Sequence, residues 1–136
     1  MVTVLTHATV FDGTRFLPGT RDVVIDGGRI ASVAEGGQGS HNAGDDHIDC
    51  TGKTIIPGVI DCHVHLTSSG AAATSNFHDP FSLQFYNSVK NMEATLKGGV
   101  TTVRDAGGTD IGAKVAVETG VVRGPRLTIA VNDRKV

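Results

Sequence analysis

The amino-acid sequence predicts an α/β fold in two regions, a small β unit followed by alternating strands and helices. Residues 2–56 contain β-branched runs separated by turn signals, without helical periodicity. Residues 59–131 follow the order β-α-β-α-β with short connections, which predicts parallel strands. Between them stands Pro57-Gly58, and a proline cannot donate to a strand ladder. We therefore place a domain junction there, which separates residues 1–56 from residues 57–136.

The first region is expected to be antiparallel and free of helix. Residues 2–10 are rich in β-branched side chains and predict the first strand. Within 22–33, two β-prone runs flank Gly27-Gly28, which fits a two-residue hairpin turn with positive φ angles. A polar, glycine-rich loop at 35–46 then precedes a last strand at 47–56.

The second region begins with a predicted strand at 59–65 and a long loop of small residues at 67–80. Asp79-Pro80 is a typical helix start, because aspartate caps and proline suits the first turn. Apolar side chains then recur at helical spacing and predict an amphipathic helix that packs on the sheet: Phe81, Phe85, Val89, Met92 and Leu96.

A shorter β-α-β run completes the pattern. Residues 100–104 predict a buried strand that ends in the turn Asp-Ala-Gly-Gly. Thr109 or Asp110 can cap a second helix, which runs to about Glu118 and stops at Gly120. A third strand is predicted at 126–131.

The strand at 59–65 carries the one spacing that suggests chemistry. Alternate residues of a strand share a face, so Asp61, His63 and His65 are expected on one side. Cys62 is then expected on the opposite side, in the core. Imidazole is the commonest metal ligand among side chains, and two on one face can bind one ion. Two buried histidines without a metal are the alternative interpretation.

Composition excludes several classes of protein. The chain has 136 residues and a net charge of −2, which gives no electrostatic footprint for nucleic acid or an anionic membrane. It shows no signal-peptide pattern and no apolar run of membrane-spanning length. Two cysteines are too few for a disulfide framework, so a cytoplasmic location is expected.

Two motifs together resemble a known family. PGVIDCHVHL at 57–66 and GGVTTVRDAGG at 98–108, after a small β unit, are similar to the N-terminal region of the amidohydrolase superfamily. Within it they resemble the imidazolonepropionase-like branch, which includes some dipeptidases. The resemblance implies a β-sandwich built from both chain ends beside a (β/α)8 TIM-type barrel. Residues 1–56 would belong to the sandwich, and 57–136 would be the first β-α-β-α-β units of an incomplete barrel.

The resemblance also implies a chemistry. His63 and His65 would bind a divalent metal, commonly zinc. Asp61 would orient an imidazole as a candidate catalytic residue; a structural hydrogen-bonding role is the alternative. Arg104 would bind a substrate carboxylate; a simple ion pair with Asp105 is the alternative. The reaction would be hydrolysis of C–N bonds in a small amide, N-acyl amino acid or dipeptide-like substrate. Water activated by the metal would be the nucleophile.

The rest of the family's ligand set does not follow in this sequence. The family's lysine or glutamate, two further histidines and aspartate base come from later strands, and a whole barrel takes about 250 residues. We therefore expect this chain alone to be inactive and to bind zinc weakly. The alternative is a non-catalytic truncated paralogue that associates with a full-length homologue. Self-association into a homo-oligomer also stays open.

Overall fold

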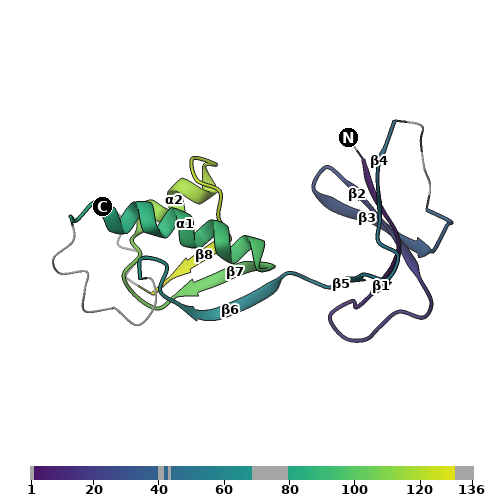
Figure 1. The fold of residues 1–136 in the computed structure, drawn as a ribbon, viewed down its shortest axis with the longest axis horizontal. Coiled ribbons are helices and arrows are strands. Elements are labelled where there is room, and N and C mark those ends of the chain that lie inside the picture. Colours follow the sequence, from purple (N-terminus) through teal and green to yellow (C-terminus); the bar gives the residue numbers. More distant parts are fainter. Residues whose placement is uncertain (1, 40–41, 43, 69–79, 131–136) are drawn as a thin grey trace. The chain divides into compact units, whose positions relative to one another are not determined.

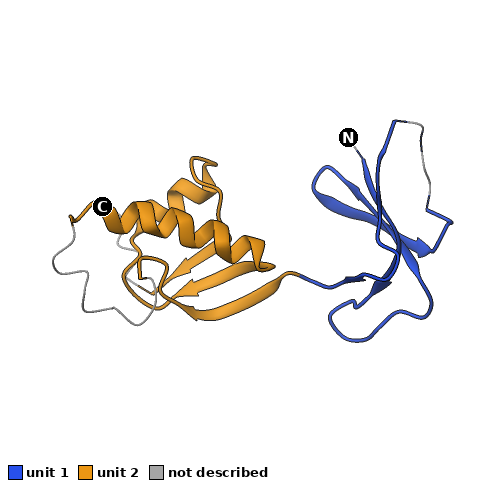
Figure 2. Cartoon of the chain, in the orientation of Figure 1, with its two compact units in different colours: residues 1–57 blue, residues 58–136 orange. Residues whose placement is uncertain are grey.

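The computed structural model describes residues 2–39, 42, 44–68 and 80–130. The chain divides into two compact units, Met1–Pro57 and Gly58–Val136 (Figure 2). Across the described residues, no helix has the length and apolar character needed to cross a membrane.

Unit 1 is a five-stranded sheet (Figure 1). Four strands lie in the order β3-β2-β1-β4, and β5 also pairs with β1. The Gly27-Gly28 hairpin is confirmed, with φ angles of 55° and 74°. The strands are β1 (Thr3–Val10), β2 (Arg21–Asp26), β3 (Arg29–Glu35), β4 (Asp46–Asp49) and β5 (Thr54–Ile55).

The expectation of a wholly antiparallel unit 1 was wrong. The pairs β1–β2 and β2–β3 are antiparallel, but β4 and β5 both run parallel to β1. The reason is that β4 does not follow β1 through a hairpin. Strand β4 instead lies on the side of β1 away from β2. It runs in the same direction as β1, as a crossover connection allows.

A buried aspartate joins distant segments of unit 1. Asp22 is 0% exposed, and its carboxylate accepts hydrogen bonds from the backbone N–H groups of His7, Gly37 and Gly39 at 2.9, 2.8 and 3.1 Å. Burial alone raises the pKa of Asp22, but these three bonds and the nearby His7 outweigh it and hold the pKa below 3.8. The carboxylate therefore stays charged in the folded unit at neutral pH.

Unit 2 has the predicted parallel order, β6-β7-β8, with α1 and α2 on one face of the sheet (Figure 1). Met92 of α1 and Val117 of α2 pack in one cluster with Val103 and Leu127, which are neighbours in the β7–β8 register. The opposite face of β7 and β8 carries exposed polar side chains. The elements are β6 (Val59–Val64), α1 (Leu83–Lys97), β7 (Val100–Asp105), α2 (Ile111–Glu118) and β8 (Arg126–Ile129).

Helix α2 matches the sequence expectation, whereas the start of α1 differs from it. Helix α2 begins after Asp110, whose side chain accepts from the backbone N–H of Ala113 at 3.2 Å, so the predicted cap is confirmed. Helix α1 begins at Leu83, and the proposed cap Asp79 lies outside the described residues. Phe81 therefore precedes the helix and is 76% exposed, whereas Met92 is 1% exposed.

Cys62 is exposed, so its predicted place in the core was wrong. Strand β6 lies at an edge of the sheet, and α1 and α2 pack chiefly over β7 and β8. The register of β6 against β7 is also irregular between Asp61 and Val64, which interrupts the alternation used in the prediction. Ile60, on the same edge strand, is 65% exposed.

Candidate metal centre

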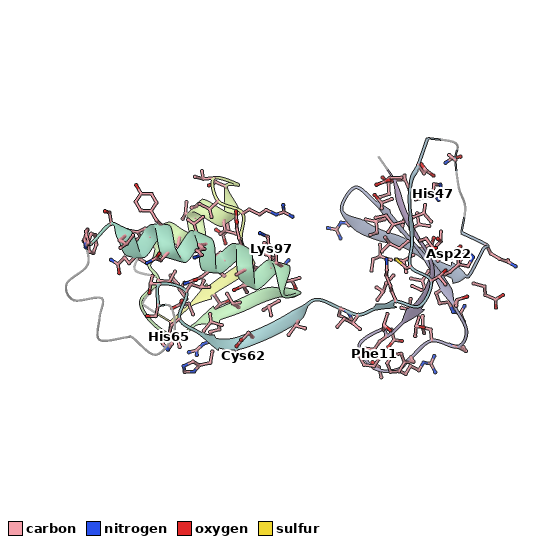
Figure 3. The ribbon with its side chains drawn as sticks, viewed as in Figure 1. Phe11, Asp22, His47, Cys62, His65 and Lys97 are labelled. Carbon is pink, nitrogen blue, oxygen red and sulfur yellow. The ribbon has the colours of Figure 1, made fainter. Side chains whose placement is uncertain are left out.

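The candidate site lies where β6 and β7 end. Parallel strands present their C-terminal ends at one edge, which is where sites of this architecture form. Val64 and Asp105, the last residues of the two strands, are register partners, and Ala106 donates its N–H to the Val64 carbonyl at 2.8 Å. His65 follows directly after β6 at this edge (Figure 3).

The structure brings the two predicted histidines together. The ring centroids of His63 and His65 are 5.2 Å apart, and the rings are inclined at 75°. Zn–N bonds of about 2.0–2.1 Å and tetrahedral angles place two imidazole centroids on one ion roughly 5 Å apart. The observed separation therefore fits two imidazoles that share a metal.

A hydrogen bond fixes the orientation of His65. Its Nδ1 lies 2.9 Å from the carbonyl oxygen of Gly107, in the turn after β7. A carbonyl can only accept, so Nδ1 carries the proton in this bond, and in the neutral ring the lone pair is left on Nε2. Metal-binding histidines commonly hold their other ring nitrogen in this way.

Asp61 acts on the backbone in this structure. Its Oδ1 accepts a hydrogen bond from the N–H of His63 at 3.0 Å. This short-range contact coincides with the irregular register between Asp61 and Val64. The simple alternation that predicted a shared face for Asp61, His63 and His65 therefore does not run through this segment, although the two histidines do meet.

Arg104 is exposed and lies beside Thr128 in the β7–β8 register, on the sheet face away from the helices. Asp105, the next residue, is 0% exposed, and its carboxylate is engaged on the helix-covered side. The alternative of an ion pair between these two described residues is therefore not what the structure shows. A guanidinium on an open face can take a carboxylate in its planar fork.

Sequence reasoning missed the role of Asp105. One of its carboxylate oxygens accepts from the Leu66 N–H at 2.8 Å and the Thr109 hydroxyl at 2.6 Å. The other accepts from the Gly107 N–H at 2.8 Å. Asp105 thus binds both the residue after His65 and the residue whose carbonyl holds the His65 ring. The available signal was an aspartate ending a buried strand directly before a glycine turn.

Two further contacts hold the same segment. The side-chain amide of Asn91, on α1, donates to the Leu66 carbonyl at 2.7 Å. Gly108 has a φ of 101°, and a Cβ placed there would lie 2.4 Å from the Thr67 hydroxyl oxygen. The turns after β6 and β7 therefore approach so closely that only glycine fits.

The described residues do not by themselves make up a complete metal site. Among them, no cluster of three or more histidine, cysteine, aspartate or glutamate side chains could hold an ion. A catalytic zinc takes three protein ligands and one water. The residues present therefore fit two positions of such a site.

Comparison with known proteins decides the family. A family model described as Amidohydrolase family matches residues 54–133. The chain belongs to this family. Among curated relatives, this amidohydrolase chain is 35% identical over 81 residues to an allantoinase of Enterococcus faecalis. It is 31% identical over 94 residues to a dihydroorotase of Trichlorobacter lovleyi. These alignments cover 60% and 69% of this chain but 15% and 19% of the relatives.

Solved structures match more of the chain. A prolidase complexed with N-methylphosphonate-L-proline is 40% identical with a TM-score of 0.81, covering 96% of this chain and 32% of the prolidase. A Xaa-Pro dipeptidase with bound methionine is 27% identical with a TM-score of 0.82, at 96% and 33% coverage. The amidohydrolase chain thus spans about a third of these structures.

Proposed function

We propose that this chain is the N-terminal region of a metal-dependent amidohydrolase that hydrolyses C–N bonds other than ordinary peptide bonds. The observation that carries the proposal is the pair of imidazoles, 5.2 Å apart, with Nδ1 of His65 bound to the Gly107 carbonyl. His63 and His65 would hold a divalent ion, zinc first. Such an ion, when bound, supplies an activated water and polarises the substrate carbonyl.

The chain's own residues have separate tasks in this proposal. His65 presents Nε2 because its Nδ1–H donates a hydrogen bond to the Gly107 carbonyl. Asp61 fixes the backbone at His63 through the 3.0 Å bond to its N–H. Arg104, exposed beside Thr128, binds the carboxylate of the substrate and so orients the scissile bond toward the end of β6.

We assign the two regions of the chain by the same reasoning. Residues 1–56 contribute to a composite β-sandwich, and residues 57–136 are the start of a (β/α)8 barrel. The support is the parallel β6-β7-β8 order with both helices on one face, which leaves the other face for a barrel interior. The coverage of about a third of each solved relative agrees with a partial barrel.

The proposed substrate is a small amide, a cyclic amide, an N-acyl amino acid or a dipeptide-like molecule. The prolidase and Xaa-Pro dipeptidase cover nearly all of this chain, which favours the dipeptide-like class. The dihydroorotase and allantoinase matches support cyclic amides less, because they cover less of the chain.

Zinc binding by the 136-residue chain tests the ligand assignment. Equilibrium dialysis should show weak binding that His63→Ala and His65→Ala each abolish. His47→Ala, an exposed histidine on β4, is the matched control and should bind as the parent does. Equal loss in the His47 variant would contradict the assignment. Stoichiometric zinc after dialysis together with hydrolysis of N-acyl amino acids would contradict the expected inactivity of the chain alone.

A chimera tests the reaction. Residues 1–130 would replace the matching segment of the 40%-identical prolidase, which supplies the remainder of its own fold. We expect hydrolysis of Xaa-Pro dipeptides, lost in His65→Ala. Arg104→Gln should raise KM by about tenfold or more with a smaller change in kcat, since it removes a charged hydrogen bond to the substrate. An unchanged KM would remove Arg104 from the substrate site.

A second candidate is a non-catalytic chain that associates with a full-length homologue. The observation that favours it is the exposed apolar surface of edge strand β6, where Val59 and Ile60 are 45% and 65% exposed. Exposed edge strands are templates for pairing with another chain. Co-purification with a full-length homologue, lost in Ile60→Lys, would support this role. A monodisperse monomer that does not bind the homologue would exclude it.

A further inference from the structure

Asp105 stands at the centre of the contacts that hold His65. Its side chain is 0% exposed, and its carboxylate accepts three hydrogen bonds. Two of the donors are backbone N–H groups, those of Leu66 and Gly107, and they approach different oxygens. The N–H groups are fixed donors, so both carboxylate oxygens must act as acceptors.

Both backbone donors belong to residues that hold His65 in place. Leu66 follows His65 in the chain, and its N–H therefore fixes the peptide that leaves the histidine. The carbonyl of Gly107 accepts a hydrogen bond from Nδ1 of the His65 ring at 2.9 Å. The Asp105 carboxylate therefore holds the backbone after His65 directly and the His65 ring through Gly107, by contacts of 2.8 to 2.9 Å.

We infer that Asp105 is a positioning residue that sets the tautomer and orientation of His65 through the Gly107 carbonyl. A carboxylate is needed because it accepts at both oxygens, whereas an asparagine in the same place would turn an NH2 group toward a backbone N–H. The displaced turn would then release Nδ1 of His65. The effect of Asp105 on the His65 tautomer is independent of the proposed function; only its effect on metal binding rests on that function.

The histidine tautomer gives a direct test that needs no metal. Long-range proton–nitrogen spectra of the 15N-labelled chain at about pH 8, where imidazole is neutral, distinguish Nδ1–H from Nε2–H. In the parent, His65 should be in the Nδ1–H form. In Asp105→Asn the ratio of Nε2–H to Nδ1–H should rise about fivefold or more, the effect of losing one ordinary hydrogen bond.

The matched control is Asp22→Asn in unit 1. Asp22 is also 0% exposed and also accepts from three donors, but these are His7, Gly37 and Gly39. It should destabilise its own unit and leave the His65 tautomer unchanged. An unchanged tautomer in folded Asp105→Asn, or an equal shift in Asp22→Asn, would overturn the positioning role.

A milder variant covers the case in which Asp105→Asn does not fold. Thr109→Val removes the 2.6 Å hydroxyl bond that helps to orient the Asp105 carboxylate, so the bonds to the Leu66 and Gly107 N–H groups should weaken without being lost. It should move the His65 tautomer in the same direction by a smaller factor. No movement in a folded Thr109→Val chain would then overturn the inference.

Zinc binding separates this inference from the proposed function. If His65 is a ligand, Asp105→Asn should weaken Zn²⁺ binding by about 10- to 100-fold, the usual effect of losing a group that orients a ligand. A tautomer shift without zinc binding in any variant would support the positioning role and contradict the metal site. Zinc binding that is equal in the parent and in Asp105→Asn would contradict the positioning role alone.

Discussion

Each unit of this chain contains a fully buried aspartate that gathers distant segments. Asp22 in unit 1 and Asp105 in unit 2 are both 0% exposed, and each accepts three hydrogen bonds spread over both carboxylate oxygens. Asp22 joins β1 at His7 to the loop after β3. Asp105 joins the segment after β6 to the turn after β7.

The difference lies in what is attached to the segments. The segments held by Asp22 belong to the β sheet of unit 1 and the loop beside it. One segment held by Asp105 offers the Gly107 carbonyl to His65. The same arrangement thus holds backbone segments together in unit 1 and, in unit 2, a segment whose carbonyl contacts the His65 ring. A buried carboxylate with all its acceptor positions filled does not by itself indicate a functional site. The residues contacted by the segments that it holds are the better indication.

Replacing each aspartate by alanine should give the largest effects. Asp105→Ala should lower the free energy of unfolding by about 3–5 kcal/mol, because it leaves buried donors without acceptors. Asp22→Ala should cost less, about 2–4 kcal/mol, since two of its three donors are only partly buried. Urea unfolding measures the total, and hydrogen exchange read by mass spectrometry assigns the loss to a unit.

Asp26→Ala is the control for both. Asp26 ends the same strand as Asp22 but is exposed, so its loss should change the free energy of unfolding by less than about 0.5 kcal/mol. If Asp22→Ala weakened protection throughout unit 2 as strongly as Asp105→Ala does, the two aspartates would not act on separate units.

Glycine variants compare the turns of the two units. Gly108→Ala should cost about 2–4 kcal/mol, because φ is 101° and the new Cβ would lie 2.4 Å from the Thr67 hydroxyl. Gly27→Ala, at φ 55° with no atom within 4 Å of the Cβ, should cost only about 1 kcal/mol. Thermal unfolding of both variants measures the difference.

The double variant Thr67→Ala/Gly108→Ala separates crowding from backbone strain. Removing the Thr67 hydroxyl leaves its Cβ at 3.7 Å, an ordinary contact distance. A portion of the Gly108→Ala loss should therefore return, which a double-mutant cycle shows as a coupling of about 1 kcal/mol or more. Additive costs would mean that the approach of the two turns is not what requires glycine.

Local patterns allowed much of the fold to be predicted. The Gly27-Gly28 turn, the Asp110 cap and the parallel β6-β7-β8 order follow from residues close together in the chain or from connection length. The direction of β4 could not be predicted, because it depends on which edge of β1 the chain reaches. The exposure of Cys62 depends on which elements cover β6, and strand alternation contains no such information.

The sequence predicted that His63 and His65 lie together, but it did not predict the residues that support them. The spacing of His63 and His65 is a local signal, and the rings do meet. Asp105, Asn91 and Gly107 reach the same place across 25 to 42 residues of sequence. Such contacts arise from strand pairing and helix docking, so a single sequence does not display them.

The pH dependence of unit 1 should reveal Asp22. Its pKa is held below 3.8 in the folded state by three backbone N–H bonds that outweigh the effect of burial. A lowered folded pKa means that the stabilisation is full above the unfolded value and is lost as pH falls through the folded one. Urea unfolding at pH steps from about 5 to 2 should therefore show a steeper acid loss in the parent than in Asp22→Asn.

Asp12 and Asp49 also have lowered pKa values, so the parent's slope contains more than one group. Bonds from the Arg15 and Thr14 backbone lower the pKa of Asp12, and Thr51 lowers that of Asp49 through its hydroxyl and then its N–H. The difference between parent and Asp22→Asn isolates one group. If the free energy of unfolding fell equally steeply with pH in the two proteins, the pKa of Asp22 would not be lowered by folding.

Helix caps within unit 2 should give the smallest effects. Asp110 caps α2 through a 3.2 Å bond to the Ala113 N–H, whereas Ser82 at the start of α1 makes no side-chain cap bond. Asp110→Ala should cost about 0.5–1 kcal/mol and Ser82→Ala close to nothing, both measured by thermal unfolding. Because α2 packs on β8 and α1 on β7, amide exchange in each helix reports its own cap. A larger loss in Ser82→Ala would show that α1 depends on a contact before Leu83.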